Sequence, residues 1–80
     1  MAIYIEINKK YENDEVVAYA YSPDDRSWGE FLINKRSLEP QCIVSIEGEK
    51  NNFYMFRAWS VVRKEYHHNG FFPERTCYAA

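Results

Sequence analysis

One stretch of this sequence, residues 51–70, constrains the fold most because it is the only long segment with helical periodicity. Apolar side chains recur there at i, i+3, i+4, i+7 and i+11, a spacing that places them on one stripe of a helix. The stripe consists of Met55, Ala58, Trp59, Val62 and Tyr66. The pattern predicts an amphipathic helix over residues 52–68, with Trp59 as the central side chain between this helix and the rest of the core.

Both ends of the stretch carry signals of helix termination. Asn51 or Asn52 can cap the first turn through a side-chain oxygen. Gly70 can adopt the left-handed conformation that closes a helix, and Pro73 prevents its continuation. The helix is therefore expected to end just before Gly70.

The residues before the helix alternate between apolar and polar in short segments separated by turn residues, which is typical of β-strands. The expected strands are residues 3–9, 16–22, 28–35 and 41–47. In the second strand, the small side chains of Ala18 and Ala20 are expected to lie beneath the helix, where close approach is needed. Gly29 indicates either a β-bulge or an aromatic ring packed on the backbone.

Short connections between consecutive strands favour an antiparallel meander, because parallel neighbours need long crossovers. The predicted fold is α+β, with a four-stranded antiparallel meander covered on one face by a single C-terminal amphipathic helix. Residues 76–79 can add a short terminal strand. A chain of 80 residues is expected to form one domain over 1–80.

Charge is unevenly distributed along the chain. Residues 1–50 hold ten acids and six bases, for a net charge of −4, whereas residues 51–80 hold two acids and four bases, for +2. The total of −2 argues against a protein dedicated to direct nucleic-acid binding, which usually presents a basic face. No apolar run approaches the roughly 20 residues that span a bilayer, and Met1 leads directly into the first strand, so we expect a cytoplasmic protein that does not bind membranes.

No catalytic, metal-binding or cofactor-binding constellation stands out, and we therefore expect a protein that is not an enzyme. Cys42 and Cys77 lack the CxxC spacing of a zinc site and are too few for a disulfide framework. Adjacent helical residues such as His67 and His68 point about 100° apart and chelate one ion poorly. Reduced thiols and a solvated helix end are the simpler interpretation.

Two acidic turns are the candidate partner-binding sites. The first holds Glu12, Asp14 and Glu15, and the second holds Asp24 and Asp25. Alternate turns of a meander emerge at opposite ends of the sheet, so the two turns are alternatives. The second turn is favoured because Pro23 rigidifies it and Trp28 lies close by as an aromatic anchor.

Several aromatic residues are expected on the uncovered face of the sheet, where they can stack nucleic-acid bases or form a protein interface. They are Tyr4, Tyr11, Tyr19, Tyr21 and Trp28. No Lys/Arg-Gly-aromatic run of the RNA-binding type accompanies them, and the acidic sheet half repels phosphate. We favour partial packing of these side chains or a protein interface.

The element order and the tail GFFPERTCYAA resemble small bacterial immunity proteins of toxin–immunity and contact-dependent growth inhibition systems. The resemblance consists of a strand of the form G-x-(L/F)-x-I-(N/D)-K and a terminal G-x-(F/Y)-P-E segment. The matching residues are Gly29, Phe31, Ile33, Asn34 and Lys35, followed by Gly70, Phe72, Pro73 and Glu74. The resemblance implies a protein that neutralises a cognate toxin, often a nuclease, by non-covalent binding. The alternative is a non-catalytic protein-binding or self-associating subunit of another bacterial assembly.

Overall fold

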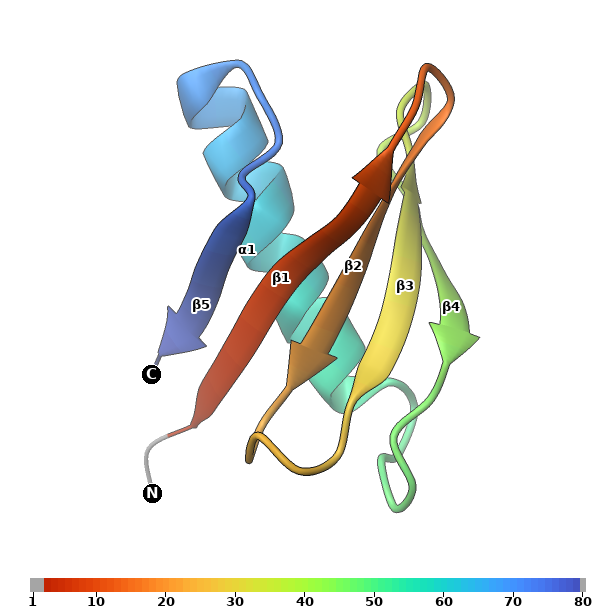
Figure 1. The fold of residues 1–80 in the computed structure, drawn as a ribbon, viewed down its shortest axis with the longest axis vertical. Coiled ribbons are helices and arrows are strands. Elements are labelled where there is room, and N and C mark those ends of the chain that lie inside the picture. Colours follow the sequence, from red (N-terminus) through yellow and green to blue (C-terminus); the bar gives the residue numbers. More distant parts are fainter. Residues whose placement is uncertain (1–2, 80) are drawn as a thin grey trace.

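The computed structural model describes residues 3–79 and consists of one antiparallel sheet and one helix (Figure 1). The elements are β1 (Tyr4–Glu12), β2 (Val16–Ser22), β3 (Gly29–Asn34), β4 (Pro40–Val44), α1 (Phe53–Asn69) and β5 (Arg75–Ala79). The strand order is β4-β3-β2-β1-β5, with every neighbouring pair antiparallel. The predicted α+β meander, its covering helix and the terminal strand are all confirmed.

The helix carries the chain from one edge of the sheet to the other. β1 to β4 are added in sequence order, and α1 then runs diagonally behind the sheet from the side of β4 (Figure 1). The chain emerges beside β1, where β5 pairs with it from Tyr4 opposite Ala79 to Asn8 opposite Arg75. One face of the sheet is therefore covered, and the other faces solvent.

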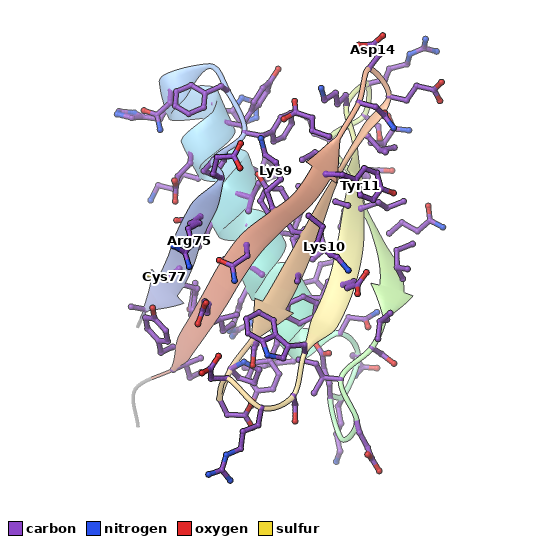
Figure 2. The ribbon with its side chains drawn as sticks, viewed as in Figure 1. Lys9, Lys10, Tyr11, Asp14, Arg75 and Cys77 are labelled. Atoms are coloured by element: carbon purple, nitrogen blue, oxygen red, sulfur yellow. The ribbon has the colours of Figure 1, made fainter. Side chains whose placement is uncertain are left out.

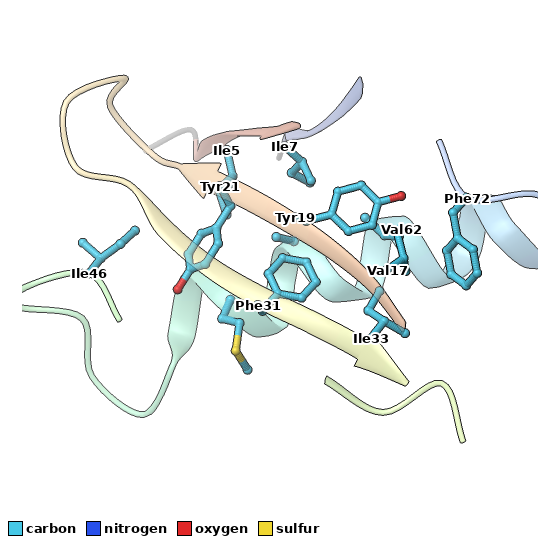
Figure 3. Close-up of a cluster of buried hydrophobic side chains, with 12 residues drawn as sticks. Ile5, Ile7, Val17, Tyr19, Tyr21, Phe31, Ile33, Ile46, Val62 and Phe72 are labelled. Carbon is cyan, nitrogen blue, oxygen red and sulfur yellow. The ribbon is translucent and has the colours of Figure 1, made fainter. Parts of the chain in front are cut away.

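The core lies between α1 and the helix-facing residues of the strands (Figure 3). Its main members are Ile5, Ile7, Val17, Tyr19, Tyr21, Phe31, Ile33, Met55, Ala58 and Val62. The Phe31 ring stacks on Tyr19 with centroids 5.7 Å apart and packs tilted against Tyr21 at 5.6 Å. Aromatic rings of roughly 150–250 Å² each thus supply much of the buried surface of this small domain.

The facing predicted for β2 is wrong. Tyr19 and Tyr21 lie in the core at 0 % exposure, so the alternating Ala18 and Ala20 face the uncovered side. There Ala18 lies opposite Tyr11 of β1. Large rings, rather than small side chains, fill the space between the sheet and a single helix, and these two tyrosines are consequently absent from the uncovered face.

Trp59 is not the central side chain of the helix. The buried line is Met55, Ala58 and Val62, while Trp59 is half-buried at its side. Its indole N–H donates to the Leu38 carbonyl at 2.8 Å, a polar contact that an indole needs and that the apolar centre does not offer. The small Ala58 takes the central place, where it allows the helix to approach the sheet closely.

The helix ends differ in how well the sequence predicts them. Gly70 adopts the left-handed conformation at φ 84°, and its N–H donates to the Tyr66 carbonyl at 2.8 Å, as expected. Asn52 is also left-handed and makes no side-chain cap. Instead, the Glu49 carboxylate accepts from the Met55 N–H at 2.9 Å and so caps the first turn from outside the helix.

Gly29 packs against an aromatic ring, the second of the two alternatives. A Cβ at this position would lie 2.5 Å from the Tyr21 ring, so the ring occupies the space that a side chain would need. A side chain at position 29 would therefore require the Tyr21 ring to shift.

Candidate functional site

The two acidic turns lie at opposite ends of the sheet, as expected from the meander (Figure 1). The β1–β2 turn is at one end, with Asp14 at its tip (Figure 2). The β2–β3 loop, which contains Asp24 and Asp25, is at the other end. A partner would therefore meet one turn or the other rather than a single acidic patch.

Within the second turn, the two aspartates differ in role. The Asp24 carboxylate accepts from the backbone N–H groups of Ser27 at 2.8 Å and Arg26 at 2.9 Å, and these bonds hold the pKa of Asp24 below its usual range. Asp24 thus organises its own loop. Asp25 has a left-handed backbone conformation, with φ 64°, and its side chain is exposed. It makes no ion pair among the described residues. The nearby Trp28 is half-buried.

The first turn is closed by a residue that sequence analysis did not single out. The Asn13 side-chain oxygen accepts from the N–H groups of Glu15 at 2.8 Å and Val16 at 2.9 Å. Asp14 and Glu15 are exposed beside Lys35 and Arg36, with which they line a polar depression. The acidic character of this turn is therefore partly offset by neighbouring cations.

Glu12 lies apart from the turn tip, in a charged cluster on the helix side of the sheet. Its two carboxylate oxygens bind the ammonium groups of Lys9 and Lys35, each at 2.6 Å. Glu74 lies 3.4 Å from the Lys9 ammonium, and the side chain of Lys9 is only 11 % exposed. Together with Phe71 and Phe72, these residues line an open depression of about 510 Å³.

A β-bulge in β1 produces this cluster. Lys9 pairs with Tyr19, whereas Tyr11 pairs with Ala18, so the alternation of β1 shifts between these two residues. As alternation from Ile5 and Ile7 requires, Lys9 faces the helix and Lys10 faces the uncovered side (Figure 2), where it binds Glu30 at 3.0 Å. The bulge turns Tyr11 to the uncovered side and brings Glu12 to the helix side, opposite Val17. Strict alternation, on which the sequence analysis relied, cannot reveal a bulge.

The charges in this cluster are held in their ionised forms. Burial lowers the pKa of Lys9, but its hydrogen bonds and charge attraction to Glu12 and Glu74 together outweigh burial, so the pKa is raised. Hydrogen bonds from Lys35 and Lys9 lower the pKa of Glu12. Proton transfer near neutral pH needs a group whose pKa lies close to 7, so these shifts suit fixed electrostatic contacts better than acid–base catalysis.

The cysteines and histidines are not brought together. Cys42 lies on β4 and Cys77 on β5, the opposite edges of the sheet, which are roughly 19 Å apart at four strand spacings. Among residues 3–79, no group of three or more His, Cys, Asp or Glu side chains is placed to hold a metal ion. An intramolecular disulfide between these cysteines is excluded by the distance.

Large apolar side chains are exposed on several surfaces of residues 3–79. Tyr4 and Tyr11 project from the uncovered sheet face, and Phe53 and Phe56 project from α1. Phe71 follows the helix and is 62 % exposed. Exposure of the two tyrosines was expected from the sequence, whereas that of the phenylalanines was not. Phe53 and Phe56 fall outside the apolar stripe of the helix, and this position alone indicates exposure.

Comparisons of this chain with protein-family models, with curated proteins and with solved structures find no match. Within residues 3–79, α1 lacks the length and apolarity that a membrane-spanning helix requires.

Proposed function

We propose that this protein is an immunity protein that neutralises a cognate bacterial toxin by tight, non-covalent binding in the cytoplasm. The observation that carries the proposal is the exposure of seven large apolar side chains among the described residues 3–79 of this small domain. They are Tyr4, Tyr11, Ile43, Val44, Phe53, Phe56 and Phe71. Aromatic anchors of this kind are enriched in protein interfaces.

Exposed carboxylates at the sheet ends support a toxin with a basic surface, such as a nuclease whose cleft binds a phosphate backbone. Asp25 is the strongest of the predicted contact residues, because its carboxylate is not used by its own loop, and Trp28 lies close to it in the chain. Asp14 and Glu15 offer the corresponding contact at the other end. Charges in such rim positions accelerate encounter with an oppositely charged partner.

Self-association as a subunit of another assembly is the second candidate. It is favoured by edge strand β4, where Ile43 is 49 % and Val44 43 % exposed. A sheet edge with exposed apolar side chains can pair with another chain. Light scattering across a concentration series distinguishes this candidate, since self-association predicts a dimer or larger species without any partner.

Co-expression with the product of the adjacent upstream gene tests the proposal. The expected result is that the protein restores growth of cells expressing that product and co-purifies with it. Asp25→Lys should weaken the complex by at least about tenfold, or about 1.4 kcal/mol, without unfolding the domain. Growth inhibition that persists despite abundant, folded protein would contradict the proposal.

A further inference from the structure

The outward side of α1 is cationic and aromatic. At 100° per residue, Phe53, Phe56, Arg57, Arg63 and Lys64 all fall on the side of the helix that points away from the sheet. We call these five residues the outer face of α1. It runs along a helix of 17 residues that lies behind the sheet in Figure 1.

No carboxylate belongs to this face. The only acid within α1 is Glu65, which lies toward β5 and accepts a hydrogen bond from the Thr76 hydroxyl. Three cations and one anion give α1 a net charge of +2, in a chain whose total is −2. The rest of the chain therefore sums to −4, and the outer face is a positive surface on an otherwise acidic protein.

Two arginines on this face are held in place by aromatic rings. The guanidinium carbon of Arg57 lies 3.8 Å from the Phe53 ring centroid, and that of Arg63 lies 4.4 Å from the Trp59 ring centroid. Stacking fixes the plane of a guanidinium and leaves its edge available for bidentate contact with a carboxylate. Such preorganisation reduces the entropy cost of binding.

These cations are not neutralised within the domain. Among residues 3–79, none of the ion pairs involves Arg57, Arg63 or Lys64, whereas Lys9, Lys10 and Lys35 are each paired. The Arg57 Nε atom is buried and has no hydrogen-bond partner among the described residues. The apolar rings of Phe53 and Phe56, 38 % and 45 % exposed, lie alongside.

From this arrangement, we infer that the outer face of α1 is a docking surface for an acidic, partly apolar segment of another protein. Its carboxylates would bind the two stacked guanidinium groups and Lys64, and its apolar side chains would cover Phe53 and Phe56. This surface contains neither acidic turn and implies a contact other than the proposed one with a basic toxin surface. Phe53 and Phe56 are also among the exposed apolar residues cited for the proposed function, but the test below uses no toxin.

The same geometry argues against nucleic acid as the occupant. Base stacking needs open aromatic faces, but Arg57 covers a face of Phe53 and Arg63 covers a face of Trp59. Both rings also contact a neighbouring ring. Phe53 packs against Tyr54, and Trp59 packs against Phe56, each pair in edge-to-face geometry.

Fluorescence anisotropy with a labelled peptide composed of Glu, Asp, Leu and Phe tests the inference. The matched probe has Gln and Asn in place of Glu and Asp. The double variant Arg57→Gln/Arg63→Gln should bind the acidic peptide at least about tenfold more weakly than the unchanged protein, or about 1.4 kcal/mol. A salt series should show affinity falling as salt rises.

The control variant Lys10→Gln/Arg75→Gln removes two positive charges from the uncovered sheet face instead (Figure 2). It should change the affinity by less than about twofold, because the peptide contacts α1 and not this face. If the arginine double variant melts at a lower temperature, Lys64→Gln tests the inference instead, because Lys64 is exposed and stacks on no ring within residues 3–79. This variant should weaken binding without altering the melting temperature.

Three results would overturn the inference. One is an equal loss in the arginine and control double variants, which would mean that only net charge matters. Another is equal binding of the acidic and neutral peptides. The third is tighter binding of a single-stranded RNA oligonucleotide or of phosphatidylserine vesicles than of the acidic peptide, which would assign the face to a different partner.

Discussion

Glu49 lies outside every regular element, yet it should be among the most important polar residues for stability. Its carboxylate accepts from the Met55 N–H at 2.9 Å, the Ile46 N–H at 3.3 Å and the Tyr21 hydroxyl at 3.0 Å. One side chain thus joins the helix N-terminus, the β4–α1 connection and the aromatic core. Burial and the bond to Glu49 both raise the pKa of Tyr21, so its hydroxyl stays protonated and acts as a donor.

The cost of Glu49→Ala follows from these contacts. Each hydrogen bond contributes about 0.5–1.5 kcal/mol net, so three contribute about 3 kcal/mol. That is a large share of the roughly 4–12 kcal/mol expected for a domain of 80 residues. The melting temperature should fall by about 12–24 °C, since each kcal/mol shifts it by about 4–8 °C in domains of this size.

Urea unfolding followed by circular dichroism measures this cost, with Glu47→Ala as the matched control. Glu47 is exposed on the same connection and makes no hydrogen bond among the described residues, so its loss should cost less than about 0.5 kcal/mol. Glu49→Gln should fall between the two variants. A loss below about 1 kcal/mol for Glu49→Ala, or one equal to that of the control, would refute this account of the helix N-terminus.

Three further changes have defined outcomes. Gly29→Ala should destabilise the domain by about 1–3 kcal/mol, because the added carbon meets the Tyr21 ring at 2.5 Å; thermal melting checks this. Glu12→Gln should destabilise at neutral pH; since the folded pKa of Glu12 is lowered from 4.5, this difference should be complete above 4.5 and shrink as pH falls through the folded pKa, as measured by urea unfolding across pH. Asp24→Asn should loosen the β2–β3 loop, seen as faster amide exchange at Arg26 and Ser27, because those amides lose their charged acceptor.

Each of these has a contradicting result. Unchanged melting of Gly29→Ala would mean that the Tyr21 ring can move aside. A Glu12→Gln deficit that grows as the solution is acidified would reverse the sign of the linkage. Unaltered exchange in Asp24→Asn would show that the loop does not depend on that carboxylate.

Much of the fold could be predicted because its signals are local. The period of the apolar residues in α1, the left-handed Gly70 and the alternation in β1 to β4 each report on neighbours in the chain. The terminal strand could also be anticipated, since residues 76–79 follow a helix that must return to the sheet. These features need no knowledge of distant contacts.

The features that differ from the sequence-based expectations depend on contacts between residues far apart in the chain. Which face of β2 is buried depends on the volume between sheet and helix, and large rings fill it better than Ala18 and Ala20. Trp59 lies at the side of the buried line because its indole N–H donates to the Leu38 carbonyl. Glu49 replaced Asn52 as the cap through a contact that reaches back from the connecting loop.

The candidate site was predicted less completely than the fold. Exposure of Asp14, Glu15 and Asp25 follows from their position in turns. The Asp24 carboxylate is bound by its own loop, and the Glu12 carboxylate is bound by two lysines. These contacts depend on the three-dimensional structure and, for Glu12, on the bulge in β1. The basic charge of residues 51–80 indicated a positive surface on this half of the chain. The stacking of Arg57 and Arg63 on aromatic rings could be seen only in the structure.

A stoichiometric titration tests the central claim, non-covalent neutralisation of a toxin, most directly. The purified product of the adjacent upstream gene is held at a fixed concentration far above the expected Kd, and its residual activity is measured against added protein. The account predicts a linear fall to zero at one equivalent and full recovery of activity after the complex is dissociated. Complete inactivation by a small fraction of an equivalent, or activity unchanged at excess, would contradict it.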